Sequence, residues 1–233
     1  MLDVSRTAAL IGDMGVQKLK NACVAVFGIG GVGSYAAEAL ARAGVGTLCL
    51  IDNDVVKPSN CNRQLTALDS TIGKKKTDVM AKRVLDINPD INVIVHDVFY
   101  DADMSERIFS QKLDFVVDAI DSIRSKESLI LECFARKIEM ISSMGAGNKL
   151  YPERFEVIDI FKTKYDPIAK ILRKRLREAG IQRLNVVCSD EQPQKTTLND
   201  DGKQVPASIS FVPSVCGLIM AGVAVRYIAG VKA

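Results

Sequence analysis

A glycine-rich segment offers the clearest chemistry in this sequence. Residues 28–33, Gly-Ile-Gly-Gly-Val-Gly, follow a short apolar run and open an alanine-rich stretch. Gly28 permits a tight turn, Gly30 leaves room for a phosphate beside the backbone, and Gly33 lets a helix pack closely on a strand. Free N–H groups at the helix start would hold the phosphate. We therefore expect a nucleotide site, with a purely structural turn as the alternative.

Polar residues after the next apolar run extend this expectation. Asp52 follows Leu48-Cys49-Leu50-Ile51, where a carboxylate that binds ribose hydroxyls is usual. The long polar loop beyond it contains Asp54, Asn60 and Arg63. A guanidinium can bind phosphate with two parallel hydrogen bonds. The alternative for this loop is a solvated surface segment.

Two charged clusters stand farther along the chain. Lysines at 74–76 precede a helical pattern, where they oppose the helix dipole unless an anion is bound nearby; a solvated face is the alternative. Asp118 and Asp121 end another apolar run, and we expect both to point into a ligand crevice. Asp121 could hold Mg²⁺ on a triphosphate, whereas capping of a helix by Asp121 or Ser122 is the alternative.

Residues 162–183 carry a local positive charge. They contain eight basic and two acidic side chains, a balance of +6 in a chain whose net charge is +3. Such a patch suits a polyanion such as RNA phosphate, and a solvated helix face is the alternative. The candidate contacts with such a partner are Lys170, Arg173, Lys174, Arg175 and Arg177.

The cysteines and the single histidine exclude several chemistries. None of the six cysteines forms a CxxC pair, so we expect no zinc site of that type. Reduced thiols and a polar N-terminal region predict a cytoplasmic protein with no signal peptide. His96 is the only histidine and is interpreted as a surface or interface residue, which leaves few routes to a histidine-based catalytic triad.

Alternating apolar runs and helical patterns must position these groups. Strands are expected at 23–27, 47–51, 91–97, 113–118 and 138–143, and helices at 33–43, 74–87, 103–110 and 124–137. This order predicts an α/β, Rossmann-like doubly wound sheet whose N-terminal half is parallel. Ligands bind such sheets at the carboxyl ends of the strands, where the polar clusters fall.

The C-terminal half has a different pattern. Residues 155–160 alternate like an antiparallel strand, 166–179 form an amphipathic helical pattern, and 189–207 are polar and predicted to form a mobile loop. The apolar stretch 212–231 contains Arg226, so we interpret it as a buried helix rather than a membrane span. Membrane association is left open.

The two ends of the chain complete the expected organisation. Residues 1–20 are predicted to form a helical lead whose apolar side chains, Leu10, Ile11, Met14 and Leu19, pack on the body. We expect one domain over residues 1–233. It comprises a nucleotide-binding core, 6–147, and a substrate-facing part with the C-terminal helix, 148–233.

Five motifs occur together in order and resemble the signature of the ubiquitin-activating-enzyme-like adenylyltransferases. They are Gly28 to Ser34, Asp52-x-Asp54, Asn60-x-Asn62-Arg63-Gln64, Gly73-x-x-Lys76 and Asp118-x-x-Asp121. Within that superfamily the chain is most similar to the tRNA threonylcarbamoyladenosine dehydratases. Segments 6–12, 118–122 and 210–222 carry this closer resemblance.

The resemblance implies ATP, Mg²⁺ and a homodimer that acts on tRNA. It implies an adenylate site made of the glycine turn (Gly28, Gly30, Gly31 and Gly33) with Asp52, Asp54, Asn60, Arg63, Lys76 and Asp121. Arg6 matches an arginine that such enzymes supply from the neighbouring subunit. The implied reaction adenylates the carboxylate of a threonylcarbamoyl group beside the anticodon. Ring closure by the same side chain then expels AMP.

Other functions remain alternatives. An adenylyltransferase for the C-terminal glycine of a ubiquitin-like sulfur carrier is disfavoured by the basic segment and the missing CxxC pairs, so no such carrier is expected. An NAD-dependent dehydrogenase would use the glycine turn and Asp52 but would not explain Arg63, Lys76 and Asp121. A non-catalytic RNA-binding protein is a third alternative. A sulfur-transfer or desulfurase-type partner and a transfer role for Cys188 are left open.

Overall fold

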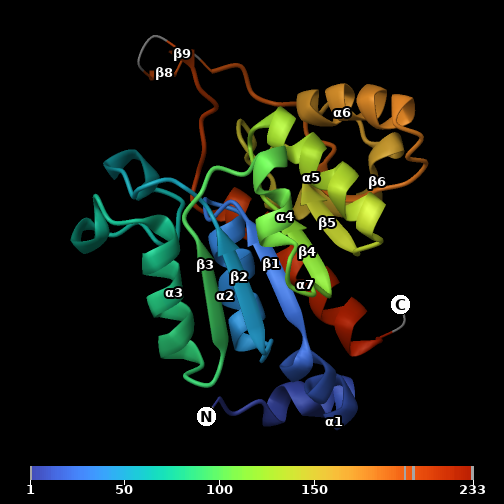
Figure 1. Cartoon of the computed structure of the whole chain (residues 1–233). Helices are drawn as coiled ribbons and strands as arrows, with labels where there is room; N and C mark the ends of the chain where they lie inside the picture. The colour runs from blue at the N-terminus through green and yellow to red at the C-terminus, as the bar shows by residue number, and fades with distance from the viewer. Residues whose placement is uncertain (1, 197, 201–202, 232–233) are drawn as a thin grey trace.

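A seven-stranded sheet forms the centre of the computed structural model, which describes residues 2–196, 198–200 and 203–231 (Figure 1). The strands lie in the order β3-β2-β1-β4-β5-β7-β6, and β6 alone runs antiparallel to its neighbour. Their bounds are β1 (Cys23–Phe27), β2 (Thr47–Ile51), β3 (Asn92–His96), β4 (Phe115–Asp118), β5 (Met140–Ser143), β6 (Phe155–Asp159) and β7 (Asn185–Ser189).

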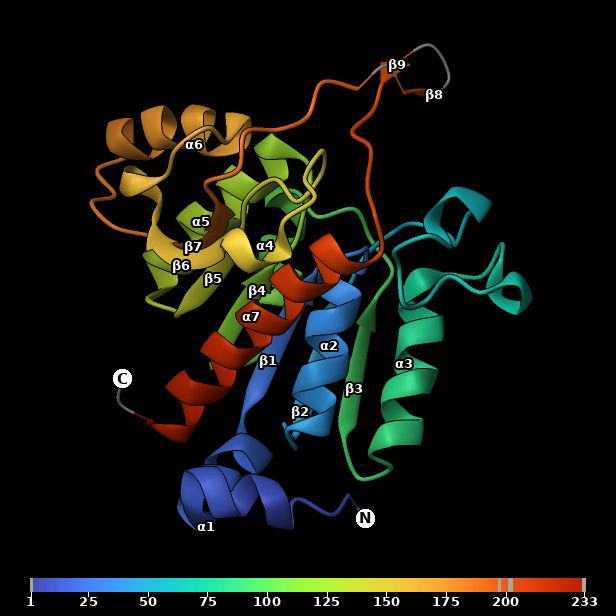
Figure 2. The same cartoon turned by 180° about the vertical axis from the view of Figure 1, so that it is seen from behind.

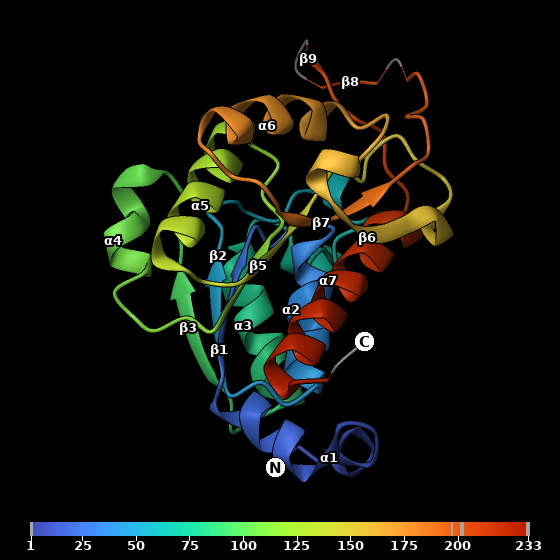
Figure 3. The same cartoon turned by 90° about the vertical axis from the view of Figure 1, so that its right-hand side faces the viewer.

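Helices cover both faces of this sheet. The helices of the first face are α2 (Gly33–Arg42), α3 (Lys76–Ile87) and α7 (Phe211–Ala229) (Figure 2). Those of the second are α4 (Ser105–Ile108), α5 (Ile123–Arg136) and α6 (Pro167–Glu178) (Figure 3). The architecture confirms the predicted α/β, Rossmann-like sheet with its parallel N-terminal half and antiparallel C-terminal addition.

The central strands are apolar because helices bury both of their sides. In β1, Val24 and Val26 belong to the core beneath α2 and α7, whereas Ala25 and Phe27 belong to the core beneath α5. The sequence of a parallel strand between two helical layers is therefore a continuous apolar run. This physical constraint made β1, β2 and β4 predictable.

The structure departs from the predicted elements in the less regular segments. No strand was predicted at β7, which lies between β5 and β6 and pairs with both. The expected helix at 103–110 is only a 3₁₀ turn, Ala102–Met104, followed by the four residues of α4. The expected loop at 189–207 contains a small hairpin, β8 (Asn199–Asp200) and β9 (Lys203–Gln204), while residues 197 and 201–202 lie outside the described residues.

The N-terminal helix α1 (Ser5–Asn21) lies at the amino ends of the central strands, far from α6 and the β8–β9 hairpin (Figure 1). It is interrupted at Gly12, whose φ of 74° is not helical. Leu19 is fully buried as expected. The expectation for Leu10 and Met14 was wrong, because these side chains are 88% and 74% exposed and face away from the rest of the chain.

The C-terminal helix α7 is a core helix. It packs beside α2 and against β4 and β5, and Val212, Cys216 and Met220 are fully buried (Figure 2). Its length and composition would also allow a membrane span, but 44% of its most apolar window is already buried in the fold. Such burial favours the predicted core helix.

A buried ionic network lies at the carboxyl end of β4. Lys126 Nζ donates to Asp118 Oδ2 (2.8 Å) and to Ser142 Oγ (3.2 Å), and Ser142 Oγ donates to the same carboxylate oxygen (2.6 Å). Asp118 and Lys126 are fully buried. The expectation that Asp118 points into a ligand crevice was therefore wrong. Its carboxylate neutralises a lysine on α5 instead.

Replacing Lys126 by methionine is expected to destabilise the protein by about 3 to 5 kcal/mol, because the Asp118 carboxylate would stay buried without its partner. The measurement is the urea dependence of unfolding. The exposed Lys82 on α3 provides a matched Lys82→Met control. The double variant Asp118→Asn/Lys126→Met should recover part of the loss, and equal costs for the single and double variants would contradict this explanation.

Candidate nucleotide site

The glycine turn between β1 and α2 is as tight as predicted. Gly28 has a φ of 85°, and a Cβ on it would lie 2.6 Å from the carbonyl oxygen of Ala119. A Cβ on Gly33 would lie only 1.7 Å from the carbonyl oxygen of Gly28. Any other residue at position 33 would force the turn apart. The turn therefore brings the end of β1 directly onto the start of α2.

The same turn leaves space for a ligand at Gly30. Of the surrounding heavy atoms, only Gln64 Nε2 would come within 4 Å of a Cβ at Gly30, at 3.8 Å. No side chain caps the start of α2. Backbone N–H groups at an uncapped helix start attract anions. The open position at Gly30 and the uncapped start of α2 together suit the binding of a phosphate group at the turn.

The turn is supported from behind by α7. A Cβ on Gly31 would lie 3.2 Å from the ring of Pro213, and a Cβ on Gly217 would lie 2.2 Å from the carbonyl oxygen of Val32. The glycine in α7 thus allows its backbone to touch the turn. The first and last thirds of the chain are joined at the nucleotide site.

Asp52 is bonded to the turn itself. Its carboxylate accepts hydrogen bonds from the backbone N–H groups of Ile29 (2.6 Å) and Asp54 (2.8 Å). Burial raises the pKa of Asp52, and the nearby charge of Lys76 opposes this rise. Each carboxylate oxygen retains a further lone pair that could accept a ribose hydroxyl.

The lysines that precede α3 mostly have acidic partners. Lys76 is buried and its Nζ lies 2.6 Å from Asp54 Oδ2, while Lys75 pairs with Asp97. These ion pairs compensate the charge that was expected to need a bound anion. Lys76 nevertheless lies beside Asp52 and Asp54, next to the glycine turn.

The loop between β2 and α3 folds back on itself beside the turn. Asn60 is buried and accepts a hydrogen bond from the Lys57 N–H group (3.0 Å). Arg63 donates to Ser59 O (2.9 Å) and Asn62 Oδ1 (2.8 Å), and burial lowers the pKa of its guanidinium. The Arg63 side chain passes within 3.5 Å of a Cβ position on Gly31. The remaining guanidinium N–H groups can therefore serve a ligand at the turn.

Asp121 lies in the exposed segment between β4 and α5. Its side chain has no hydrogen bond or ion pair in the described part of the chain. Ser122, rather than Asp121, caps α5 by accepting from Ser125 N–H (3.5 Å). Across residues 2–196, 198–200 and 203–231, no three His, Cys, Asp or Glu side chains gather around a metal-sized site. A magnesium ion here would depend on Asp121 and phosphate oxygens.

Arg6 is not part of this group within one chain. It lies exposed on the first turn of α1, at the amino ends of the strands, whereas the glycine turn lies at their carboxyl ends (Figure 1). A role for Arg6 in the site therefore requires a second copy of the chain.

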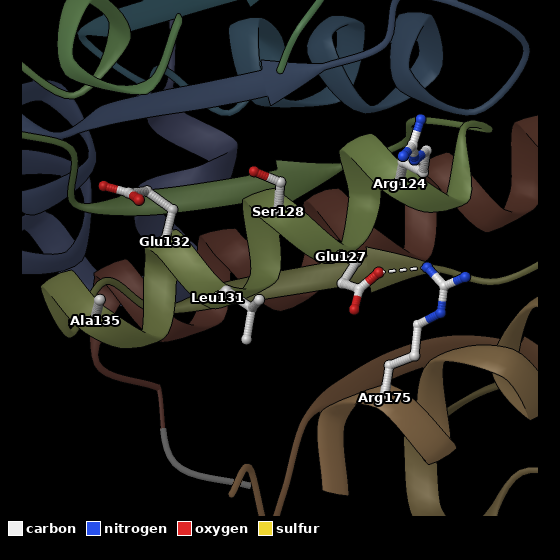
Figure 4. A pocket seen from close by; sticks show the side chains of 7 residues that line it. All are labelled: Arg124, Glu127, Ser128, Leu131, Glu132, Ala135 and Arg175. Atoms are coloured by element: carbon white, nitrogen blue, oxygen red, sulfur yellow. Dashed lines mark hydrogen bonds and ion pairs between the residues drawn. The ribbon is translucent and has the colours of Figure 1, made fainter. Parts of the chain in front are cut away.

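Some basic side chains of α6 contact other groups of the fold, and others are exposed to solvent. Arg173 donates to Thr163 O (3.0 Å), Arg175 bonds Glu127, and Arg177 lies over the ring of Phe161. The Arg175–Glu127 pair crosses an open groove of about 640 Å³ between α5 and α6 (Figure 4). Lys170 and Lys174 are exposed, which makes them better suited than Arg173 or Arg175 to bind phosphates.

Cys188 and His96 show no features of catalytic groups. Burial raises the pKa of the Cys188 thiol to about 12, so the thiolate needed for nucleophilic transfer is disfavoured. His96 ends the edge strand β3, and burial lowers the pKa of its imidazole. Both imidazole nitrogens are buried without a hydrogen-bond partner among the described residues, so the side chain does not face solvent as a surface residue would.

Three residues near the site were given no role from the sequence, although Gln64 stands in one of the five motifs. Gln64 lies against Gly30, Pro213 against Gly31, and Lys126 holds Asp118. The sequence pattern could have indicated that Lys126 is buried, because it shares a helix face with the apolar residues 129, 130 and 133. A lysine on an apolar stripe indicates a buried acidic partner. Gln64 stood within its motif and Pro213 within segment 210–222, but neither carried a sign of its contact with the glycine turn.

The fold and the site define a nucleotide-binding α/β protein whose phosphate turn is surrounded by two basic side chains and an exposed carboxylate. Sequence comparison narrows this class. A match to the ThiF family spans residues 4–233, and the chain belongs to that family.

Individual relatives are similar over most of the chain. The tRNA threonylcarbamoyladenosine dehydratase of Bacillus subtilis is 49% identical over 231 residues, which cover 94% of this chain and 91% of that protein. The dehydratase of Escherichia coli is 45% identical over 171 residues, 73% of this chain and 64% of that protein. A crystal structure of the E. coli enzyme in complex with ATP superposes with a TM-score of 0.89 at 36% identity, covering 97% of this chain and 93% of that one.

Proposed function

We propose that this protein catalyses the ATP-dependent dehydration of N6-threonylcarbamoyladenosine in tRNA. The observation that carries the proposal is the open phosphate position at Gly30, in a turn that contacts the Arg63 side chain and the backbone of Ala119 and Ile120, just before Asp121. Asp52 links the same turn to Asp54, the partner of Lys76. The similarity to dehydratases that include an ATP-bound structure supports ATP as the nucleotide and tRNA as the substrate. The sulfur-carrier and dehydrogenase alternatives are less consistent with these comparisons.

The proposed chemistry starts at the substrate carboxylate, which is a poor electrophile. Its oxygen attacks the α-phosphorus of ATP, pyrophosphate leaves, and an acyl-adenylate forms. An atom of the same side chain then attacks the activated carbonyl, a ring closes and AMP leaves with the original carboxylate oxygen. The net change in the nucleoside is the loss of one water. Because the closure is intramolecular, proximity replaces a protein nucleophile.

The residues of the site have separable roles in this proposal. The glycine turn binds phosphate through backbone N–H groups, and Asp52 accepts ribose hydroxyls. Lys76 and Arg63 offset negative charge that develops at the α-phosphate. Asp54 and Asn60 hold Lys76 and the Arg63 loop in place. Mg²⁺ on Asp121 and phosphate oxygens would supply further charge neutralisation.

We also propose a homodimer in the cytoplasm as the active form. Leu10 and Met14 leave apolar side chains exposed on either side of the break in α1, close in sequence to Arg6. A second copy could cover these side chains and bring Arg6 to the partner's phosphate site. A two-fold interface would complete both sites symmetrically.

The test is to incubate the protein with ATP, Mg²⁺ and tRNA bearing the threonylcarbamoyl group, and to measure AMP and the mass of the modified nucleoside. We expect AMP formation together with a nucleoside lighter by one water. Unmodified tRNA is the matched control and should release no AMP. AMP formation that needs a small carrier protein instead of tRNA would overturn the proposal and favour the sulfur-carrier alternative.

A further inference from the structure

An exposed tyrosine beside α6 has an unusual backbone conformation. Tyr165 is 58% exposed and has a φ of 57°. A bulky residue rarely adopts this left-handed region, and it persists only where the surrounding structure holds it. The residue before it, Lys164, is also exposed. The fold thus holds an unfavourable backbone conformation at a position where two neighbouring side chains are exposed to solvent.

Thr163 is the first residue that holds Lys164 and Tyr165 in place. Its side chain is buried and donates to Ile160 O (2.6 Å), and its carbonyl oxygen accepts from Arg173 on α6 (3.0 Å). The hydrogen bond from Arg173 to Thr163 therefore holds the chain immediately before Lys164 and Tyr165.

The buried carboxylate of Asp166 holds the same segment in place. One oxygen caps α6 by accepting from Ala169 N–H (2.9 Å), and the other accepts from Gly145 N–H (3.0 Å) and Lys149 Nζ (3.3 Å). Gly145 and Lys149 belong to the loop that leaves the carboxyl end of β5. Asp166 therefore fixes the segment with Lys164 and Tyr165 to the edge of the sheet at which ligands bind.

A second exposed tyrosine follows the loop that leaves β5. Tyr151 is 49% exposed, and its backbone N–H donates to the buried carboxylate of Glu191 (3.0 Å). Arg154 bonds the adjacent Asp190 (2.7 Å); this bond lowers the pKa of Asp190, and the charge of Lys164 adds to the effect. The loop that bonds to Asp166 through Gly145 and Lys149 therefore continues directly into the segment that contains Tyr151.

We propose that Tyr165 and Tyr151 stack on unpaired bases of the tRNA loop that carries the substrate adenosine. Lys164 and Lys170 would bind the adjoining phosphates. This inference rests on the proposed function and adds a base-binding surface to it. Single-stranded RNA loops are recognised by aromatic rings that stack on splayed bases and by cations along the backbone. The excess positive charge of residues 162–183 favours this occupant over an apolar protein surface.

The surface also has a suitable connection to the nucleotide site. Asn148 accepts from Ala207 N–H (2.7 Å), and Asn62, next to Arg63, donates to Ser208 O (2.9 Å). The segment 205–210 therefore joins the loop after β5 to the loop beside the glycine turn. A tRNA loop held at Tyr165 would be anchored to the same framework that holds the phosphate groups.

The decisive variant is Tyr165→Gly, because glycine removes the ring and favours the left-handed backbone. We expect a thermal midpoint no lower than that of the wild type and an affinity for a fluorescent anticodon stem-loop reduced about tenfold or more, as for the loss of one stacked base. Tyr165→Phe keeps the stacking face and should bind within about twofold of the wild type. Phe134→Ala removes a ring that is 42% exposed near the end of α5 and is the matched control.

Kinetics and salt dependence separate stacking from other roles. Tyr165→Gly should raise the KM for tRNA while the KM for ATP is unchanged. Its binding defect should persist at high salt, whereas a defect in Lys170→Ala should diminish as counterions screen the phosphates. Wild-type affinity in Tyr165→Gly would overturn the stacking proposal, as would a change in oligomeric mass, since the ring would then belong to a contact between two copies.

The experiment also separates this proposal from the proposed function. If the wild type converts the modified nucleoside but Tyr165→Gly binds RNA normally, only the stacking proposal fails. If the wild type binds the stem-loop through Tyr165 but forms no AMP with modified tRNA, the dehydration proposal fails and the RNA surface stands.

Discussion

Replacing Arg6 by alanine is expected to reduce AMP formation by about 10²- to 10³-fold, the loss typical of one charge-stabilising donor. The exposed position of Arg6 predicts little change in the urea midpoint of unfolding. The measurement is the rate of AMP release with modified tRNA. Lys20→Ala removes another exposed cation from α1 and should retain wild-type activity.

A mixing experiment tests whether Arg6 acts in a second copy. Arg6→Ala and Arg63→Ala should each be nearly inactive alone. After subunit exchange, each mixed dimer would contain one site with both arginines, so about a quarter of wild-type activity should return. A mixture as inactive as its components would contradict a contribution across the dimer and would leave the remote position of Arg6 without a function.

Replacing Asp121 by alanine is the second change expected to have a large effect. AMP formation should fall by at least about 100-fold, because the charge of the triphosphate would lose its proposed magnesium ligand. Asp121 is exposed and Ser122 caps α5, so the fold should be unaffected. Thermal unfolding and the Mg²⁺ dependence of AMP release are the measurements.

A matched control for Asp121 is Asp86→Ala, which removes an exposed carboxylate from the last turn of α3. This variant should behave like the wild type. Residual activity of Asp121→Ala that recovers at high Mg²⁺ would agree with a weakened metal site. Full activity at ordinary Mg²⁺ would remove Asp121 from the proposed mechanism.

Much of the nucleotide-binding half could be predicted because its constraints are local. Strands buried on both faces must be apolar throughout, and the spacing of Gly28 and Gly33 reflects a contact made within a single turn. Strand β7 was missed because its short apolar run becomes a strand only through pairing with β5 and β6. Tertiary contacts of this kind leave little trace in a local pattern.

The site was harder to predict where two similar residues have different partners. Asp118 and Asp121 follow the same strand, but only Asp118 meets a buried lysine from α5. Leu10 and Leu19 both suit the apolar side of α1, yet the break at Gly12 and the position of α1 leave only Leu19 covered. Spacing alone did not indicate which partner each residue would find.

The contact of α7 with the glycine turn also has a consequence for the order in which the protein matures. Gly217 and Pro213 touch the backbone of residues 31–32, although a ribosome would release the turn long before α7. Contacts between such distant segments form late. Until α7 docks, the phosphate turn of a nascent chain would therefore lack the support that Pro213 and Gly217 give its backbone.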